Sequence, residues 1–176
     1  FRRKAWLDVG GERLCFRRGH DLDLYLRMDE GFEFEVLPDV LLHYRIHGKN
    51  VSVTTVESQG LCSLAARRSS ALRRCGKPDP LTKWIRAIDA EAVQTLGCTP
   101  ADCETAILDC IGGQIAISIA AGCGERAEAL IDRLRQRRLH SPALATQAFH
   151  EFVADARMAA WRGKRGQVRL AAGRLW

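Results

Sequence analysis

The first 37 residues combine short apolar stretches with glycine. Ala5 to Val9 is apolar apart from one aspartate and is followed by Gly10-Gly11, which predicts a single helical turn ended by glycines. From Gly19 to Gly31, apolar residues recur at helical spacing, and Asp21 and Asp23 fall in the first turn, where carboxylates meet the positive end of the helix dipole. The pattern therefore predicts a helix over residues 19–31.

Two strands are predicted after this helix. Residues 32–37 alternate between apolar and charged side chains with period two, and Pro38 follows them. Residues 40–47 form the second candidate, whose pleat would place His43, Arg45 and His47 on one face. A face with two imidazoles and a guanidinium suits an anion or a metal-bound phosphate.

The rest of the chain is alanine-rich and has the periodicity of helices. Thr99-Pro100-Ala101-Asp102 predicts a helix start with a threonine N-cap and a proline at the first helical position. Because composition changes near Thr55, we expect two parts, residues 1–55 and residues 56–176. The expected helices of the second part span 63–74, 81–96, 100–121, 125–138 and 142–161.

Charge separates the same two parts. The 176 residues contain 27 Lys and Arg against 21 Asp and Glu, a formal net charge of +6. Residues 1–55 are neutral, so the excess lies in residues 56–176, above all towards the C-terminal end. A solvated basic surface is the plain interpretation. The functional alternative is contact with an anionic membrane or a phosphorylated acceptor, and nucleic acid is not expected because no aromatic residues are interleaved with these arginines.

Seven cysteines occur without a CxxC pair, which argues against a zinc ribbon and a thioredoxin-type site. Most are surrounded by small apolar residues, so we expect buried, reduced thiols and a cytoplasmic protein. No uncharged apolar run reaches the length of about 18 to 20 residues that a membrane-spanning helix needs. The first residue is Phe1 and no signal peptide follows it, which suggests a piece of a longer chain.

Residues 1–52 contain three segments, Phe1–Gly11, Asp21–Arg27 and Val36–Ser52, with Phe16 between the first two. In their order and their gaps, these residues resemble the closing third of a family 2 glycosyltransferase domain. The resemblance implies a GT-A fold, in which a nucleotide-diphosphate sugar is held through a divalent metal, Mg or Mn. The expected fold class is therefore an α/β fragment, the end of a GT-A nucleotide-diphospho-sugar transferase domain, followed by an all-α region, with helix predominating overall.

The resemblance also implies roles for individual residues. Asp21 matches the family's catalytic base, which takes the proton from the acceptor hydroxyl. His47 matches a histidine close to the metal and the diphosphate. His20, which stands where the family usually has glutamate, together with Asp23, Arg45 and Gly11, is expected to contact substrate. For Asp23 a structural role is the alternative, since it lies about 200° around the helix from Asp21.

Asp21 and Asp23 also fit a bare DxD metal pattern. In the family, however, that motif follows an earlier strand, whereas this pair opens a helix, so the pair is not taken as the metal motif.

The leading hypothesis is that the chain is a piece of an inverting, metal-dependent transferase of bacterial polysaccharide or envelope glycans. The 176 residues alone are expected to be inactive. The partners of the transferase would be a nucleotide-diphosphate sugar and a glycan or lipid-linked acceptor, at the cytoplasmic face of the inner membrane. The alternatives are a basic helical module that binds membrane or nucleic acid and a His-Asp metal phosphohydrolase built on His20 and Asp21.

Overall fold

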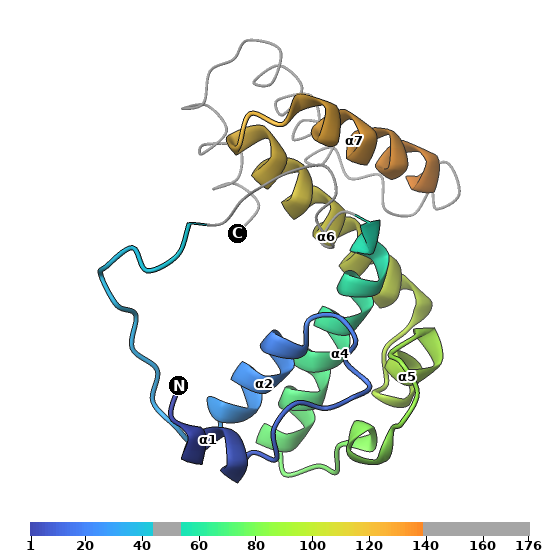
Figure 1. Cartoon of the computed structure of the whole chain (residues 1–176). Helices are drawn as coiled ribbons and strands as arrows, with labels where there is room; N and C mark the ends of the chain where they lie inside the picture. The colour runs from blue at the N-terminus through green and yellow to red at the C-terminus, as the bar shows by residue number, and fades with distance from the viewer. Residues whose placement is uncertain (44–53, 139–176) are drawn as a thin grey trace. The chain divides into compact units, whose positions relative to one another are not determined.

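A computed structural model describes residues 1–43 and 54–138 of the chain, and it is mostly helical (Figure 1). Within these residues no strand is present. The helices are α1 (Arg3–Asp8), α2 (His20–Met28), α4 (Val56–Arg74), the 3-10 helix η1 (Pro80–Lys83), α5 (Ala90–Thr95), α6 (Pro100–Ala120) and α7 (Gly124–Arg138).

The chain divides into two compact units. The first contains residues 1–43 and 57–107, and the described residues of the second are 54–56 and 108–138. The composition change near Thr55 thus falls between stretches that pack together in the first unit. A compact unit can form across such a change, so the division into residues 1–55, as the end of a GT-A domain, and residues 56–176, as a helical accessory region, stays a prediction.

The helices predicted in the first 31 residues are confirmed. α1 ends before Gly10 and Gly11, whose φ values of 78° and 68° lie in the left-handed region that favours glycine. α2 begins after Gly19, also with positive φ, and carries Asp21 and Asp23 in its first turn. The sequence therefore places the acidic first turn of α2 correctly.

The strand predicted over residues 32–37 is wrong. These residues are irregular, and the large apolar side chains among them are exposed, including Val36 at 92%. Alternation produces a strand only where a neighbouring strand accepts its backbone hydrogen bonds, and the described residues offer none. Of the second predicted strand, residues 40–43 are irregular and residues 44–47 lie outside the described part. The α/β character expected of this region is therefore not present in the described residues.

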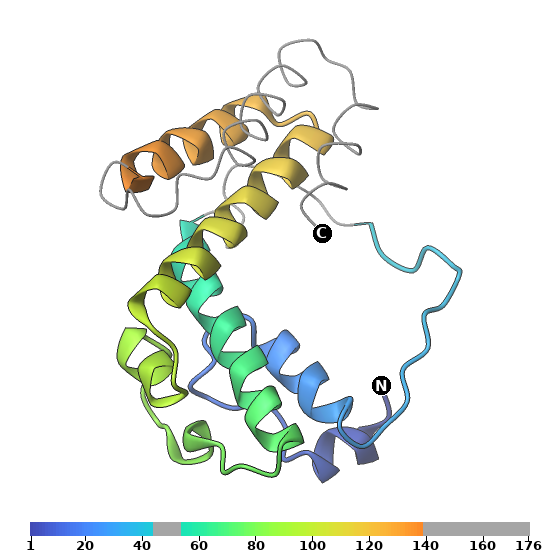
Figure 2. The same ribbon diagram turned by 180° about the vertical axis from the view of Figure 1, so that it is seen from behind.

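α2 and α4 lie alongside each other and run in the same direction (Figures 1 and 2). At the start of α2, a Cβ atom on Gly19 would lie 3.7 Å from the Cβ of Cys62. Just beyond its end, Glu30 pairs with Arg73 of α4 at 2.7 Å. The two contacts are eleven residues apart on each side, from Gly19 to Glu30 and from Cys62 to Arg73, so the two helices stay side by side over that length.

The predicted helix over residues 81–96 is wrong as a single element. The structure has η1 and α5 instead, separated by an irregular stretch. In that stretch the backbone N–H of Ile88 donates to the carbonyl of Cys15 at 3.1 Å, and Asp89 caps α5 by accepting from Ala92 N at 2.9 Å. A tertiary backbone bond and a local cap therefore interrupt the helical pattern.

α6 and α7 are confirmed close to their predicted limits. Thr99 and Asp102 form the expected capping box: Asp102 N donates to Thr99 Oγ1 at 3.2 Å, and Thr99 N donates to Asp102 at 2.7 Å. α6 stops before Gly122, at φ 71°. The guanidinium of Arg126 on α7 donates to the Gln114 amide oxygen of α6 at 2.6 Å. The helix predicted over 142–161 lies outside the described residues.

By length and composition, α6 could cross a membrane, and it is the only described helix of which this is true. The expectation that no segment spans a membrane rests on uncharged apolar runs alone, whereas α6 contains acidic residues such as Glu104 and Asp109. In this structure 44% of its apolar window is buried. The core helix of a soluble protein has the same properties. The absence of a membrane-spanning segment and the cytoplasmic localisation therefore both stay predictions.

The main core of the first unit joins residues from both ends of that unit. Cys15 and Phe16 of the early loop pack with residues of α4, η1, α5 and the start of α6. All seven cysteines are free thiols, and Cys15, Cys62 and Cys98 are among the buried ones. The expectation of buried cysteines in apolar surroundings is confirmed for these three, whereas Cys75 is exposed.

Candidate functional site

The first turn of α2 presents His20 and Asp21 on the protein surface. Both side chains are exposed, and one carboxylate oxygen of Asp21 accepts a hydrogen bond from the backbone N–H of Leu22 at 2.9 Å. A carboxylate at this position gains from the positive end of the helix dipole. Asp21 is therefore accessible to a molecule that approaches from solvent, as a proton acceptor must be.

Asp23 points to the opposite side of α2 and is completely buried. It is bound by two guanidinium groups: Nε of Arg13 donates at 3.0 Å, and Nε of Arg27 donates at 3.0 Å. A second nitrogen of Arg13 also bonds Asp23. Of the two roles expected for Asp23, structural or in contact with an acceptor, this burial favours the structural one.

Arg27 ties α2 back to the turn that follows α1. Its guanidinium donates to the carbonyl of Val9 and, at 2.6 Å, to the carbonyl of Gly11. Gly11 is buried, and a Cβ atom there would come within 2.7 Å of the Trp6 ring. The structure therefore gives Gly11 a tight turn, one of the two roles expected for it.

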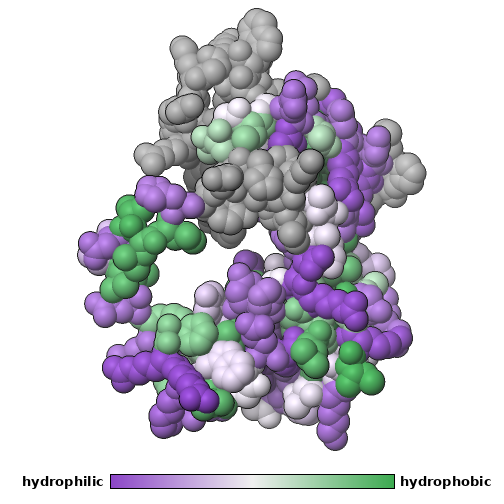
Figure 3. Space-filling model, in the orientation of Figure 1, coloured by the Kyte–Doolittle hydropathy of each residue, from purple (hydrophilic) through white to green (hydrophobic). Residues whose placement is uncertain are grey.

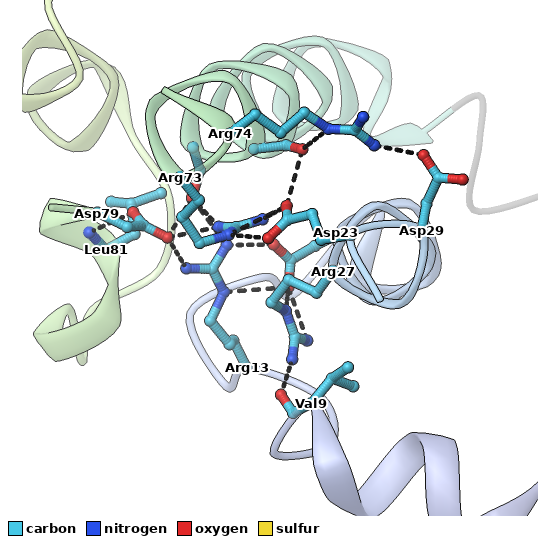
Figure 4. Close-up of polar contacts among 12 residues, drawn as sticks. Val9, Arg13, Asp23, Arg27, Asp29, Arg73, Arg74, Asp79 and Leu81 are labelled. Carbon is cyan, nitrogen blue, oxygen red and sulfur yellow. Dashed lines mark hydrogen bonds and ion pairs between the residues drawn. The ribbon is translucent and has the colours of Figure 1, made fainter. Parts of the chain in front are cut away.

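Arg13 extends the network away from α2 into the helical part of the chain (Figure 4). Besides Asp23, it donates to Asp79 at 2.7 Å and to the Ser69 hydroxyl at 3.1 Å. Asp79 lies in the loop before η1, where it also accepts from the backbone N–H of Leu81 at 3.0 Å and from Arg73 at 2.6 Å. One guanidinium thus joins two carboxylates that are 56 positions apart in the sequence.

The end of α2 is held by a second set of contacts to α4. Arg73 donates to Glu30 at 2.9 Å and 2.7 Å, and the Ser70 hydroxyl donates to the same carboxylate at 2.9 Å. Arg74 pairs with Asp29 at a more exposed position (Figure 4). Carboxylates and guanidinium groups therefore alternate along the network, in the order Asp23, Arg13, Asp79, Arg73 and Glu30.

The network shifts the pKa values of its members towards their charged forms. Burial alone would raise the pKa of Asp79, but the Ser69 hydroxyl and the Arg13 guanidinium outweigh it and hold the pKa below its ordinary value. The pKa of Glu30 is likewise lowered, because its bonds to Arg73 and Ser70 outweigh its burial. For Arg13, the bonds to Asp23 and Asp79 outweigh burial and raise the pKa. These groups stay charged at neutral pH.

The structure gives no position for two of the predicted site residues. Arg45 and His47 lie outside the described residues, and His43, at the end of the irregular segment, is exposed. No group of three or more His, Cys, Asp or Glu side chains in the described part could hold a metal ion. The divalent metal therefore has no observed ligand set here, and both it and the phosphohydrolase alternative remain untested.

Sequence reasoning missed the residues that join α2 to the helical part. Ser69, Arg73 and Asp79 lie close together in the sequence, but Arg13 precedes Ser69 by 56 positions, and no local motif links it to them. A signal existed only for Asp23 and Arg27, whose spacing of four on a helix predicts an ion pair, observed at 3.0 Å.

Comparison of the chain with known protein families, characterised proteins and solved structures finds no match.

Proposed function

We propose that this chain is the C-terminal portion of a metal-dependent, inverting glycosyltransferase of family 2. The observation that carries the proposal is the order and spacing of the segments in residues 1–52, from Phe1–Gly11 through Asp21–Arg27 to Val36–Ser52. In the proposed reaction a sugar passes from a nucleotide-diphosphate donor to an acceptor hydroxyl of a bacterial polysaccharide or envelope glycan.

Asp21 acts in this proposal as the general base. Its carboxylate takes the proton of the acceptor hydroxyl while that oxygen forms a bond to the anomeric carbon. The bond from the anomeric carbon to the diphosphate oxygen breaks, and its electron pair leaves with the nucleoside diphosphate. The exposure of Asp21 on a helix fixed by buried ion pairs supports the assignment.

The proposal also includes roles for His20, Arg45 and His47. His20 lies next to Asp21 and is exposed, so it is available to contact the acceptor. A divalent metal, Mg or Mn, with His47 nearby, and Arg45 at the diphosphate would stabilise the leaving group. The proposed acceptor is a glycan or a lipid-linked one, at the cytoplasmic face of the membrane.

The test begins with the coding DNA upstream of Phe1, followed by expression of the whole reading frame. Purified protein is incubated with nucleotide-diphosphate sugars, Mg²⁺ or Mn²⁺ and glycan acceptors, and the released nucleoside diphosphate is measured. We expect Asp21→Asn to lower kcat by about 10² to 10⁴-fold, the usual contribution of a general base. Because Asp21 is exposed, its substitution should leave the free energy of unfolding within about 0.5 kcal/mol of wild type.

The matched control is Asp29→Asn, which removes an exposed carboxylate just beyond the other end of α2. We expect it to retain kcat within a few-fold. An absence of donor-dependent release by the whole protein, or equal kcat for Asp21→Asn and wild type, would contradict the proposed function.

A further inference from the structure

α2 is linked to the helical region, which the family resemblance does not cover, near both of its ends. The link near its start passes through Arg13, and the link at its end is direct. Near its start, the buried Asp23 is bonded to Arg13, and Arg13 is in turn bonded to Asp79. At its end, Glu30 is bonded to Arg73 and Ser70. Between the two ends, Leu22 and Leu26 of α2 pack on the main core.

Arg73 is the residue common to both attachments. One nitrogen of its guanidinium lies 2.6 Å from Asp79, and another lies 2.7 Å from Glu30. The guanidinium is planar and presents several donors in a fixed fork, so the two carboxylates are held at a set distance from each other. The side chain is only 20% exposed, which limits competition from water.

We infer that Arg73 and Asp79 are positioning residues for the proposed catalytic base. They act through α2: Asp79 fixes Arg13, Arg13 fixes Asp23, and Asp23 lies two residues from Asp21 on the same helix. Neither residue contacts substrate in this assignment. The helical region from residue 69 to residue 79 therefore belongs to the catalytic part of the protein, and this catalytic role rests on the function proposed above.

A small displacement of Asp21 has a large consequence for transfer. A misplacement of a catalytic group by about 1 Å can cost about 10²-fold in rate. Because Arg73 and Asp79 do not touch the donor, their loss should lower kcat and leave the KM for the nucleotide sugar within about twofold. A merely structural role elsewhere in the fold would not produce this separation.

The first experiment measures amide hydrogen exchange in the 176-residue chain. In Arg73→Gln, we expect protection of the α2 amides to fall at least about tenfold relative to amides in α7, because the buried carboxylate of Asp79 and the partly exposed carboxylate of Glu30 both lose a partner. The matched control is Arg74→Gln, on the same helix, whose ion pair with Asp29 is half exposed. This variant should change α2 protection by no more than about threefold.

The second experiment measures kcat and KM in the protein from the whole reading frame. We expect Arg73→Gln to lower kcat by about 10²-fold, and Arg73→Lys to restore part of it, since lysine keeps the charge and can reach one carboxylate. If Arg73→Gln does not fold, Glu30→Gln, which keeps the side-chain shape and removes one charge, replaces it in both experiments.

The two experiments separate this inference from the proposed function. If wild type transfers sugar, Asp21→Asn is inactive and Arg73→Gln keeps wild-type kcat, the positioning role is overturned while the function stands. Equal loss of α2 protection in Arg73→Gln and Arg74→Gln would also overturn it. If wild type transfers nothing but exchange shows the selective loss in α2, the attachment of α2 stands and its catalytic meaning falls with the proposed function.

Discussion

α2 and the segment directly after it differ sharply in the partners that their side chains find. On α2, Asp23 is buried between two guanidinium groups, and Leu24 and Met28 pack on α1 and its following turn. In residues 32–42, by contrast, seven large apolar side chains are exposed, and the segment runs as an irregular trace away from the helices (Figure 1). In Figure 3 the same stretch, at the left edge, alternates between hydrophobic and hydrophilic surface. Adjacent parts of one chain thus stand at opposite extremes of burial.

The difference shows what each pattern needs in order to be satisfied. An α-helix satisfies most of its backbone hydrogen bonds internally, so α2 requires only a face to pack against. A strand requires a neighbouring strand for its backbone, and none is present in the described residues. Within the segment 32–42, the ring of Phe34 meets that of Tyr25 edge-on, with centroids 6.2 Å apart. Within the described residues, the backbone of α2 therefore finds the hydrogen-bond partners that a helix needs, whereas the segment 32–42 has no neighbouring strand.

The largest effect should come from removing the charge at the centre of the α2 attachment. Asp23→Ala leaves Arg13 and Arg27 without their shared carboxylate in a buried site, and breaking such a pair typically costs about 3–5 kcal/mol. We expect the free energy of unfolding, measured by denaturant titration followed by circular dichroism, to fall by about that amount.

The matched control for this loss is Asp29→Ala, which breaks only the half-exposed pair with Arg74. Such pairs contribute about 0–1 kcal/mol. Equal losses for the two variants would show that burial does not distinguish the two carboxylates, contrary to the structure.

Acid should weaken the α2 attachment next in size. Asp79 and Glu30 have lowered pKa values in the folded protein, so the unfolded chain binds protons more readily than the folded one. Their contribution to stability is therefore complete above the ordinary pKa values, 3.8 and 4.5, and is lost as the pH falls through the folded values. Denaturation midpoints measured from pH 7 down to pH 3 should decline below about pH 4.5.

Asp79→Asn tests whether this decline comes from the network. The variant lacks one of the two titrating carboxylates, so its midpoint should be lower at pH 7 and should fall less steeply on acidification. A variant whose curve ran parallel to that of wild type would assign the acid sensitivity to other groups.

The smallest effect is expected in the exposed segment. Val36 is 92% exposed, so Val36→Ser removes almost no buried apolar surface. Surface substitutions of this kind usually change the free energy of unfolding by less than about 0.5 kcal/mol, and denaturant titration should find the same here. A loss above about 1 kcal/mol would mean that Val36 is covered by a partner in solution.

The sequence predicted those elements whose signals are local. α2, α6 and α7 follow from periodicity and from caps such as the Thr99–Asp102 box, which needs only four consecutive residues. The single helix over 81–96 failed because Ile88 bonds to Cys15, a contact invisible in local pattern. The exposure of Asp21 and burial of Asp23 follow from their separation around the helix, whereas the link from Arg13 to Asp79 spans 66 positions and no periodicity encodes it.

The most direct test of this account is amide hydrogen exchange in the unaltered 176-residue chain, read separately for α2 and for residues 33–43. We expect protection of the amides from Leu24 to Met28 comparable with that of α4, and exchange at nearly unprotected rates in residues 33–43. Unprotected α2 amides would contradict the proposal that α2 is held in place by its ion pairs and so positions Asp21. Strong protection across residues 33–43 would contradict the irregular, unpaired segment and restore the predicted strand.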